Sequence, residues 1–209
     1  MLKLPSKAAC VVACCVLLCT YVSAHNGKVG YAYPLPAISV DGNFLDWPKD
    51  IIKYPISTFL SETKAVNDAD YNGFFQVGYR VEDHSLYLAF TITDDIFMED
   101  TSANVKWDSQ DGLELYLDAR HLPTGSAVAS FMYSKKLRNI NRSMYDPFTK
   151  NASWDITEVA MAIDGTTRRY EWKIKLGDQL VVGKTIGLDC FAFDRDPDGS
   201  FSFASWGKG

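Results

Sequence analysis

Acidic and aromatic side chains gather at the start of one predicted strand. Residues 107–118 read Trp-Asp-Ser-Gln-Asp-Gly-Leu-Glu-Leu-Tyr-Leu-Asp, so leucines alternate with polar or aromatic residues. This period of two predicts a strand with one buried face, preceded by a loop that carries Trp107 and Asp111. An indole stacks on the apolar face of a pyranose, and carboxylates accept hydrogen bonds from its hydroxyls. Trp107, Asp111 and Glu114 therefore predict a sugar-binding site; the alternative from the residues alone is an acidic turn before an ordinary sandwich strand.

The composition is that of a globular protein with a mildly acidic surface. The chain has 209 residues, 47% of them hydrophobic and 13% aromatic, and a formal net charge of −5. This length is typical of one domain with a real core. A nucleic-acid-binding protein would present a basic face, so the charge balance argues against such a partner.

The first 24 residues have the pattern of a secretion signal. Lys3 and Lys7 flank a short N-terminal region, and an apolar run follows at 8–19. Val22-Ser23-Ala24 then offers small residues for cleavage before His25. The run is shorter than the ~20 residues of a membrane span. We expect a signal peptide at 1–24, an extension at 25–35 and a domain at 36–209, secreted or periplasmic and not inserted in a membrane. An uncleaved membrane anchor is the alternative.

Four of the five cysteines lie in this leader, and only Cys190 lies outside it. The exported chain is thus expected to lack an internal disulfide. Cys190 alternates in phase with Ile186 and Leu188, which predicts a small core residue rather than a nucleophile.

Short alternating runs separated by turn residues predict an all-β, antiparallel sandwich. A hairpin turn is expected at 82–85 and another at Asp164-Gly165, and the second hairpin directs Trp172 into the core. Residues 57–66 and 177–181 are expected to form at most short helical turns. The predicted strands are 74–82, 85–93, 112–118, 127–134, 156–163, 169–176 and 185–193, with shorter candidates at 37–40 and 200–205.

Several motifs occur in an order that points to a family. They are Val40-Asp-Gly-Asn-Phe-Leu-Asp-Trp47, Val77-Gly-Tyr-Arg80, Leu86-Tyr-Leu-Ala-Phe90, Thr93-Asp-Asp95, Trp107, Asp111-Gly-Leu-Glu-Leu-Tyr-Leu-Asp118, Tyr170-Glu-Trp-Lys-Ile174, Ile186-Gly-Leu-Asp-Cys-Phe-Ala-Phe-Asp194 and Ser205-Trp-Gly207. Over residues 36–209 the chain resembles the family 9 carbohydrate-binding modules and their sugar-binding relatives among the DOMON-like β-sandwiches. The resemblance implies an immunoglobulin-like or jelly-roll sandwich that binds the end of a mono-, di- or polysaccharide without catalysis, as in modules for polysaccharide breakdown.

The resemblance also implies roles for individual residues. Trp107 matches a wall of the family's sugar cleft, Glu114 matches a hydroxyl-binding glutamate, and Trp206 is either a second aromatic contact or a core residue. Asp94 matches the family's calcium region. Calcium prefers flexible sets of oxygen ligands, so the expected metal set is Asp94, Asp95, Glu99 and Asp100. A solvated acidic loop is the alternative interpretation of this set.

Two departures from the family pattern stand out. The arginine expected on the strand after the acidic one is absent, with Met132 near its place, and the chain ends three residues after Trp206. The loop that carries the family's second tryptophan and the closing strand are therefore not in this sequence. We expect either a fragment of a larger enzyme or receptor, fused to a further domain, or a cleft with one aromatic wall.

Other chemistry is less well supported by the residues. Asp111 and Glu114 form the carboxylate pair closest to a glycosidase arrangement, but neither has an evident reason for a raised pKa, so we expect no enzyme. Asp194, Asp196 and Asp198 have calcium-loop-like spacing but are also explained by a turn. Two alternatives keep the fold: a ligand-sensing domain of a membrane receptor, and a haem-binding domain with methionine and histidine ligands.

Overall fold

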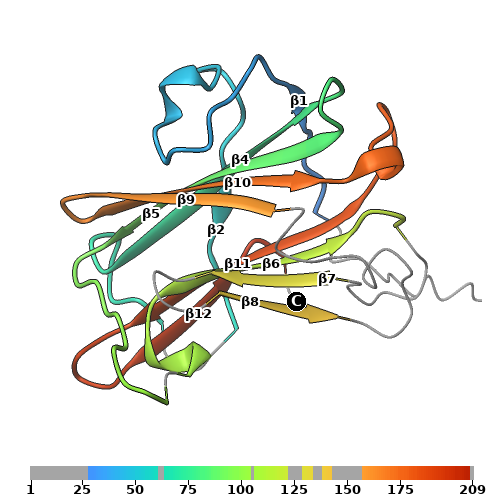
Figure 1. Ribbon diagram of the computed structural model, residues 1–209. Coiled ribbons are helices and arrows are strands. Elements are labelled where there is room, and N and C mark those ends of the chain that lie inside the picture. Colours follow the sequence, from blue (N-terminus) through green and yellow to red (C-terminus); the bar gives the residue numbers. More distant parts are fainter. Residues whose placement is uncertain are drawn as a thin grey trace, which may run out of the picture.

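The computed structural model is a sandwich of two six-stranded sheets that face each other (Figure 1). It describes residues 28–60, 64–104, 106–121, 129–133, 138–142 and 157–207, without the side chains of 107, 129–133 and 138–142. The predicted leader at 1–24 lies outside the described residues. No helix within these ranges has the length and apolar character needed to cross a membrane. The predicted all-β sandwich is confirmed.

The first sheet has the order β1-β4-β5-β10-β9, with β2 pairing the same edge of β4 as β1. Its strands are antiparallel except for the short parallel pair β1–β4. The bounds are β1 Tyr33–Pro34, β2 Tyr54–Ile56, β4 Tyr71–Arg80, β5 Ser85–Asp94, β9 Thr157–Asp164 and β10 Thr167–Lys175.

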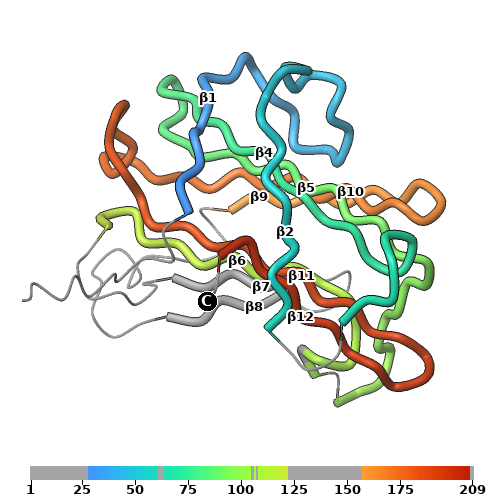
Figure 2. The backbone as a smooth tube through the Cα atoms, turned by 180° about the vertical axis from the view of Figure 1, so that it is seen from behind, coloured from blue at the N-terminus to red at the C-terminus, as the bar shows by residue number. Residues whose placement is uncertain are grey.

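The second sheet is antiparallel throughout, in the order β3-β12-β11-β6-β7-β8. The chain changes sheets between β2 and β3, and Figure 2 shows this segment running along one side of the sandwich. The bounds are β3 Thr58–Phe59, β6 Gly112–Asp118, β7 Ala129–Tyr133, β8 Arg138–Arg142, β11 Gly187–Arg195 and β12 Phe201–Ser205.

The core lies between the two sheets and is built from alternate residues of each long strand. Leucines 113, 115 and 117 of β6 meet Leu88 and Phe90 of β5, and Trp172 of β10 is fully buried among them. The other face of β6 carries Glu114, Tyr116 and Asp118. Period-two alternation thus identified the core strands correctly.

A second, smaller core covers the outer face of the first sheet. Residues 35–51 fold across it and bury Leu35, Trp47 and Ile51 against Tyr87 and Ala89. In Figure 1 this segment lies above β4 and β10. Trp47 belongs to this separate cluster and not to the main core.

The predicted strands agree with the observed ones to within three residues at their described ends, and residues 177–179 form the expected helical turn. Two expectations were wrong. Residues 37–40 are not a strand, because Ile38 and Val40 pack onto the second core without pairing in a sheet. Residues 57–66 include strand β3 rather than a helix, and β1, β2 and β8 were not predicted.

Candidate functional site

The loop between β5 and β6 carries most of the residues that the sequence predicted to be functional. Within it, a 3-10 turn (η2, Trp107–Ser109) packs against β11. Lys106 N donates to Ser109 Oγ at 3.1 Å, and that hydroxyl donates to Asp100. Asp100 also accepts a hydrogen bond from Ser102 N at 2.8 Å. This network fixes the backbone around Trp107, whose side chain lies outside the described atoms.

Glu114 lies on the outer face of β6, paired with Phe191 on β11 and with Met132 on β7. The same face carries a cluster of aromatic rings: Phe191 lies 4.9 Å from Tyr116 and 5.0 Å from Phe203 between ring centroids. Glu114 is 5% exposed. A carboxylate beside aromatic rings has the chemistry of a sugar-contacting residue, and this role of Glu114 stays a prediction.

Asp111 ties three segments together instead of facing a ligand. Its Oδ1 accepts from Arg195 N and its Oδ2 accepts from Met98 N, both at 2.8 Å, while Asp111 N donates to Met98 O at 3.0 Å. The residue is 2% exposed. Because both oxygens are used internally, the geometry does not support the sugar contact expected of Asp111. It gives this residue a positioning role between the Trp107 loop and β11.

A buried arginine holds the same carboxylate. Arg168 on β10 is 3% exposed; its Nη1 contacts Asp94 at the end of β5, and its Nη2 lies 3.4 Å from Asp111 Oδ2. The guanidinium also stacks over Phe97, 4.2 Å from the ring centroid. Arg168 thereby joins the first sheet to the start of β6.

Asp194 on β11 completes a group of three buried carboxylates with Asp94 and Asp111. Burial, and then the negative charge of Asp94, raise the pKa of Asp194 to about 8. The same two causes raise the pKa of Asp111 to about 7, although Arg168 opposes them. Three acids and one arginine leave this end of the sandwich short of positive charge.

Among the described residues, two sets of three carboxylates have oxygens close enough together to hold a metal ion. One set is Asp94, Asp111 and Asp194, and the other is Asp70, Asp194 and Asp196. The expected set of Asp94, Asp95, Glu99 and Asp100 is not one of them. Asp95 is exposed, and Asp100 holds the Trp107 loop as described above. Asp94 is the one member that lies in a cluster, and it is already paired with Arg168.

The two sets of carboxylates therefore differ in how well they suit a calcium ion. Between Asp94 and Asp111 the guanidinium of Arg168 already supplies a positive charge. At Asp194, both carboxylate oxygens are buried and lack a hydrogen-bond partner among the described residues. Carboxylate oxygens suit calcium, so the residues fit the ion on the Asp194 side.

Trp206 is a core residue. It is 7% exposed and packs edge-on against Phe75 and Tyr54, with ring centroids 5.4 Å and 5.9 Å away. Of its two expected roles, the geometry supports the structural one.

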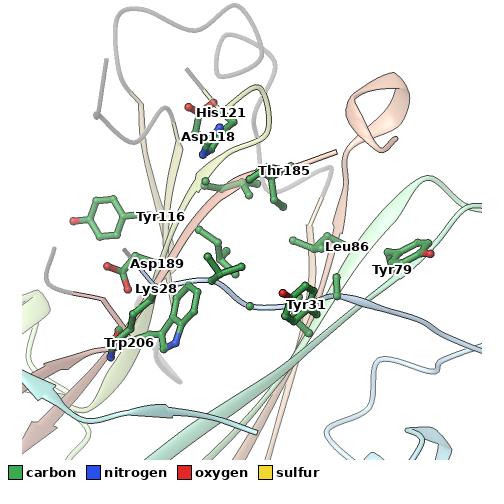
Figure 3. A pocket seen from close by; sticks show the side chains of 18 of the residues that line it. Lys28, Tyr31, Tyr79, Leu86, Tyr116, Asp118, His121, Thr185, Asp189 and Trp206 are labelled. Carbon is green, nitrogen blue, oxygen red and sulfur yellow. The ribbon is translucent and has the colours of Figure 1, made fainter. Parts of the chain in front are cut away.

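A cavity of about 1150 Å³ lies at the other end of the strands, where β5 and β11 begin. In Figure 3 the N-terminal segment with Lys28 and Tyr31 crosses it between Trp206 and Leu86. Its lining includes Val77, Leu180 and Leu188, so it is mainly apolar. Among the described side chains, Tyr116 and Phe191 of the second sheet also line this cavity, whereas Glu114 does not.

Sequence reasoning missed the partners of these acids. Arg168 was not singled out, and for Asp194 and Asp196 the sequence left open a calcium-like loop and an ordinary turn. The available signal was that Asp194 continues the inward phase of Cys190 and Ala192 on β11, so that it is buried.

Comparison with known proteins connects this geometry to one family. The model of the carbohydrate family 9 binding domain-like family matches residues 40–207. Two structures of a family 9 carbohydrate-binding module from Caldicellulosiruptor kristjanssonii, in complex with glucose and with cellotriose, have the same fold. Both have a TM-score of 0.65; the sequence identities are 13% and 14%, over 85% of this chain and 85% and 84% of theirs.

No curated protein matches the chain. The family model covers most of the sequence, and the two-sheet fold agrees with it. The chain therefore belongs to the carbohydrate family 9 binding domain-like family.

Proposed function

We propose that the protein binds carbohydrate, without catalysis, on the face of the second sheet that carries Glu114. The observation that carries the proposal is that the Trp107 turn packs against β11, the strand whose Phe191 pairs with Glu114. An indole and a carboxylate from neighbouring elements supply the stacking and hydrogen-bonding groups that a pyranose needs. The related modules in complex with glucose and cellotriose support a glucose-type ligand.

The carboxylates support binding rather than hydrolysis. Glycoside hydrolysis requires two carboxyl groups that flank the glycosidic bond. Asp111 uses both oxygens to hold backbone N–H groups and is 2% exposed, so it is not available as a partner for Glu114. We therefore expect no release of reducing sugar from soluble glucans or xylans.

The principal test is calorimetric titration with glucose, xylose, cellobiose and xylobiose. We expect Trp107→Ala to weaken binding by ~1–3 kcal/mol through loss of a stacking anchor, with the fold unchanged. Glu114→Gln should weaken it less, because the amide keeps one hydrogen-bond acceptor.

A matched control is Tyr31→Ala, which removes an exposed aromatic ring at the cavity end of the sandwich. It should leave sugar affinity unchanged. If the wild type binds none of these sugars, the proposed function is wrong. If Tyr31→Ala loses affinity and Trp107→Ala does not, the ligand occupies the cavity instead.

We also propose that residues 1–24 export the protein and are removed before His25. The pattern of lysines, apolar run and small residues supports this. Mass spectrometry of protein recovered after export should give the mass of a chain that begins at His25. A mass that includes residues 1–24 would favour the membrane-anchored alternative.

A further inference from the structure

The cavity at the end of the sandwich reaches both faces of the second sheet. Its lining includes Leu117, which belongs to the main core, and Tyr116, which lies on the outer face with Glu114. Consecutive residues of a strand face opposite sides, so one cavity contacts both of them only by passing around a border of the sheet. Such a border exists at β11. β12 pairs with residues 191–195 of this strand, and no described strand pairs with residues 187–190 on that side.

The outer part of the cavity adjoins the site proposed for sugar. Tyr116 follows Glu114 by two residues on β6, so their backbones are about 7 Å apart along one face of the strand. The ring of Tyr116 lies 4.9 Å from that of Phe191, the residue that pairs with Glu114, and Phe203 lies 5.0 Å beyond Phe191. All three rings line the cavity. A row of aromatic rings therefore leads from Glu114 into the cavity.

The part of the cavity between the sheets is apolar. Val77 and Leu86 line it from the first sheet and Leu188 from the second, and Figure 3 shows Leu86 on the side opposite the outer-face ring of Tyr116. Two exposed valines, 181 and 182, add apolar surface from the turn that precedes β11. A cavity of about 1150 Å³ with this lining favours an apolar group, because binding removes both surfaces from water.

The charged residues of the lining favour a neutral ligand. Lys28 and Lys184 are matched in number by Asp118 and Asp189. Lys28 Nζ donates to the backbone carbonyl of Trp206, and Asp189 Oδ1 accepts from two backbone N–H groups, both at 2.8 Å. A carboxylate or phosphate ester in this cavity would need an additional cation to compensate its charge, whereas a neutral molecule needs none.

We propose that the ligand is a neutral glycoside with an apolar aglycone. Its sugar lies on the outer face at Glu114, and its aglycone passes the ring of Tyr116 and enters the cavity. The proposal rests on the carbohydrate binding proposed above and names the class of ligand that the same site takes. The sugar supplies the hydroxyls that a carboxylate binds, and the aglycone supplies the apolar surface that the cavity lacks when empty.

The test compares glucosides that differ only in the length of an alkyl chain. Methyl, hexyl and octyl β-glucoside are titrated by calorimetry, each below the concentration at which it forms micelles. We expect octyl glucoside to bind at least about tenfold more tightly than methyl glucoside, because each buried methylene raises the affinity by up to about fourfold. Equal affinities for the three glucosides would overturn the proposal.

A second probe, the octyl ether of tetraethylene glycol, has the same chain on a neutral head group that is not a sugar. It should bind at least about tenfold more weakly than octyl glucoside, because it lacks the ring and hydroxyls of the sugar. If the ether binds as tightly and no sugar binds, both the proposed function and this proposal fail. If methyl and octyl glucoside bind equally well, only this proposal fails.

Two variants place a charge in the lining of the cavity. Val181→Asp and Val182→Asp change valines that are 56% and 63% exposed, so both variants should fold, as circular dichroism can check. Each should lower the ratio of octyl to methyl glucoside affinity at least about threefold. The matched control is Val81→Asp, at a valine that is 48% exposed in the turn after β4 and does not belong to the lining. Its ratio should equal that of the wild type; an equal loss in the control, or no loss in either cavity variant, contradicts the proposal.

Discussion

At the scale of single residues, Gly78 shows how one missing side chain positions a whole segment. A Cβ atom at this site on β4 would stand 2.4 Å from Leu35 Cγ. Leu35 belongs to the second core, which holds residues 35–51 on the first sheet. The glycine is therefore needed for close packing.

We expect Gly78→Ala to lower the free energy of unfolding by about 1–3 kcal/mol, because the added methyl group overpacks the contact with Leu35. Urea unfolding followed by circular dichroism measures the change. The matched variant is Leu35→Ala combined with Gly78→Ala. If the glycine matters through this contact, the double variant loses less than the sum of the single losses. Strict additivity would contradict this explanation.

The residue scale also separates binding from positioning. Of the three residues at the predicted sugar site, Glu114 lies on the expected face and Asp111 acts inside the protein. Trp107 lies in a turn fixed by Ser109 and Asp100. The spacing of the acids located the loop but did not distinguish the acid that faces outward from the one that faces inward.

At the scale of elements, the segment of residues 35–51 that forms the second core is held by one buried glutamate. Glu171 on β10 is fully buried; its Oε2 accepts from Asp41 N at 2.9 Å and Gly42 N at 3.0 Å, and its Oε1 accepts from Trp47 Nε1 at 2.7 Å. Glu171 lies on the face of β10 opposite Trp172, and the segment of residues 35–51 covers that face.

Glu171→Gln should lower the free energy of unfolding by about 1–3 kcal/mol near neutral pH. The amide nitrogen would replace one carboxylate oxygen and cannot accept the hydrogen bonds made to that oxygen, so buried N–H groups would be left unpaired. Loss of protection of the 39–47 amides in hydrogen exchange would localise the effect. The control is Glu158→Gln on the adjacent strand, where the carboxylate is largely exposed and pairs with Lys173. That change should cost little.

The same residue predicts a pH dependence. Burial raises the pKa of Glu171 above its usual value, even though the bonds from Trp47, Asp41 and Gly42 oppose this. The folded protein therefore holds this proton to a higher pH than the unfolded chain does. Its contribution to stability is complete below the unfolded pKa of ~4.3 and falls as the pH rises through the folded pKa. Unfolding at a series of pH values should show a smaller decline for Glu171→Gln; equal slopes would contradict the assignment.

At the scale of the whole molecule, the described residues share a core between two sheets, and the one cysteine among them is free. Cys190 is fully buried, and burial raises the pKa of its thiol. The other four cysteines are at positions 10, 14, 15 and 19. A chain with serine at those four positions should unfold at the same temperature with and without dithiothreitol, because a buried neutral thiol neither pairs nor exchanges. A shift on reduction would reveal a disulfide between molecules and contradict this prediction.

The sheets also decide which sites are neighbours. β5, β6 and β11 each run from one end of the sandwich to the other, with the cavity at one end and the acidic groups at the other. The cavity and the acidic groups thus lie at opposite ends, and Tyr116 and Phe191, the rings beside Glu114, also line the cavity.

By itself, the sequence determined the all-β class, most of the long strands, the core direction of Trp172 and the position of the Trp107 loop. These features follow from local periodicity, since alternate side chains of a strand face opposite sides. Only the tertiary structure decided that Arg168 meets Asp94, that Asp70 meets Asp194, and that Trp47 meets Glu171. These partners are far apart in the chain, and which strand lies beside which depends on the packing of all of them together, which no local pattern records.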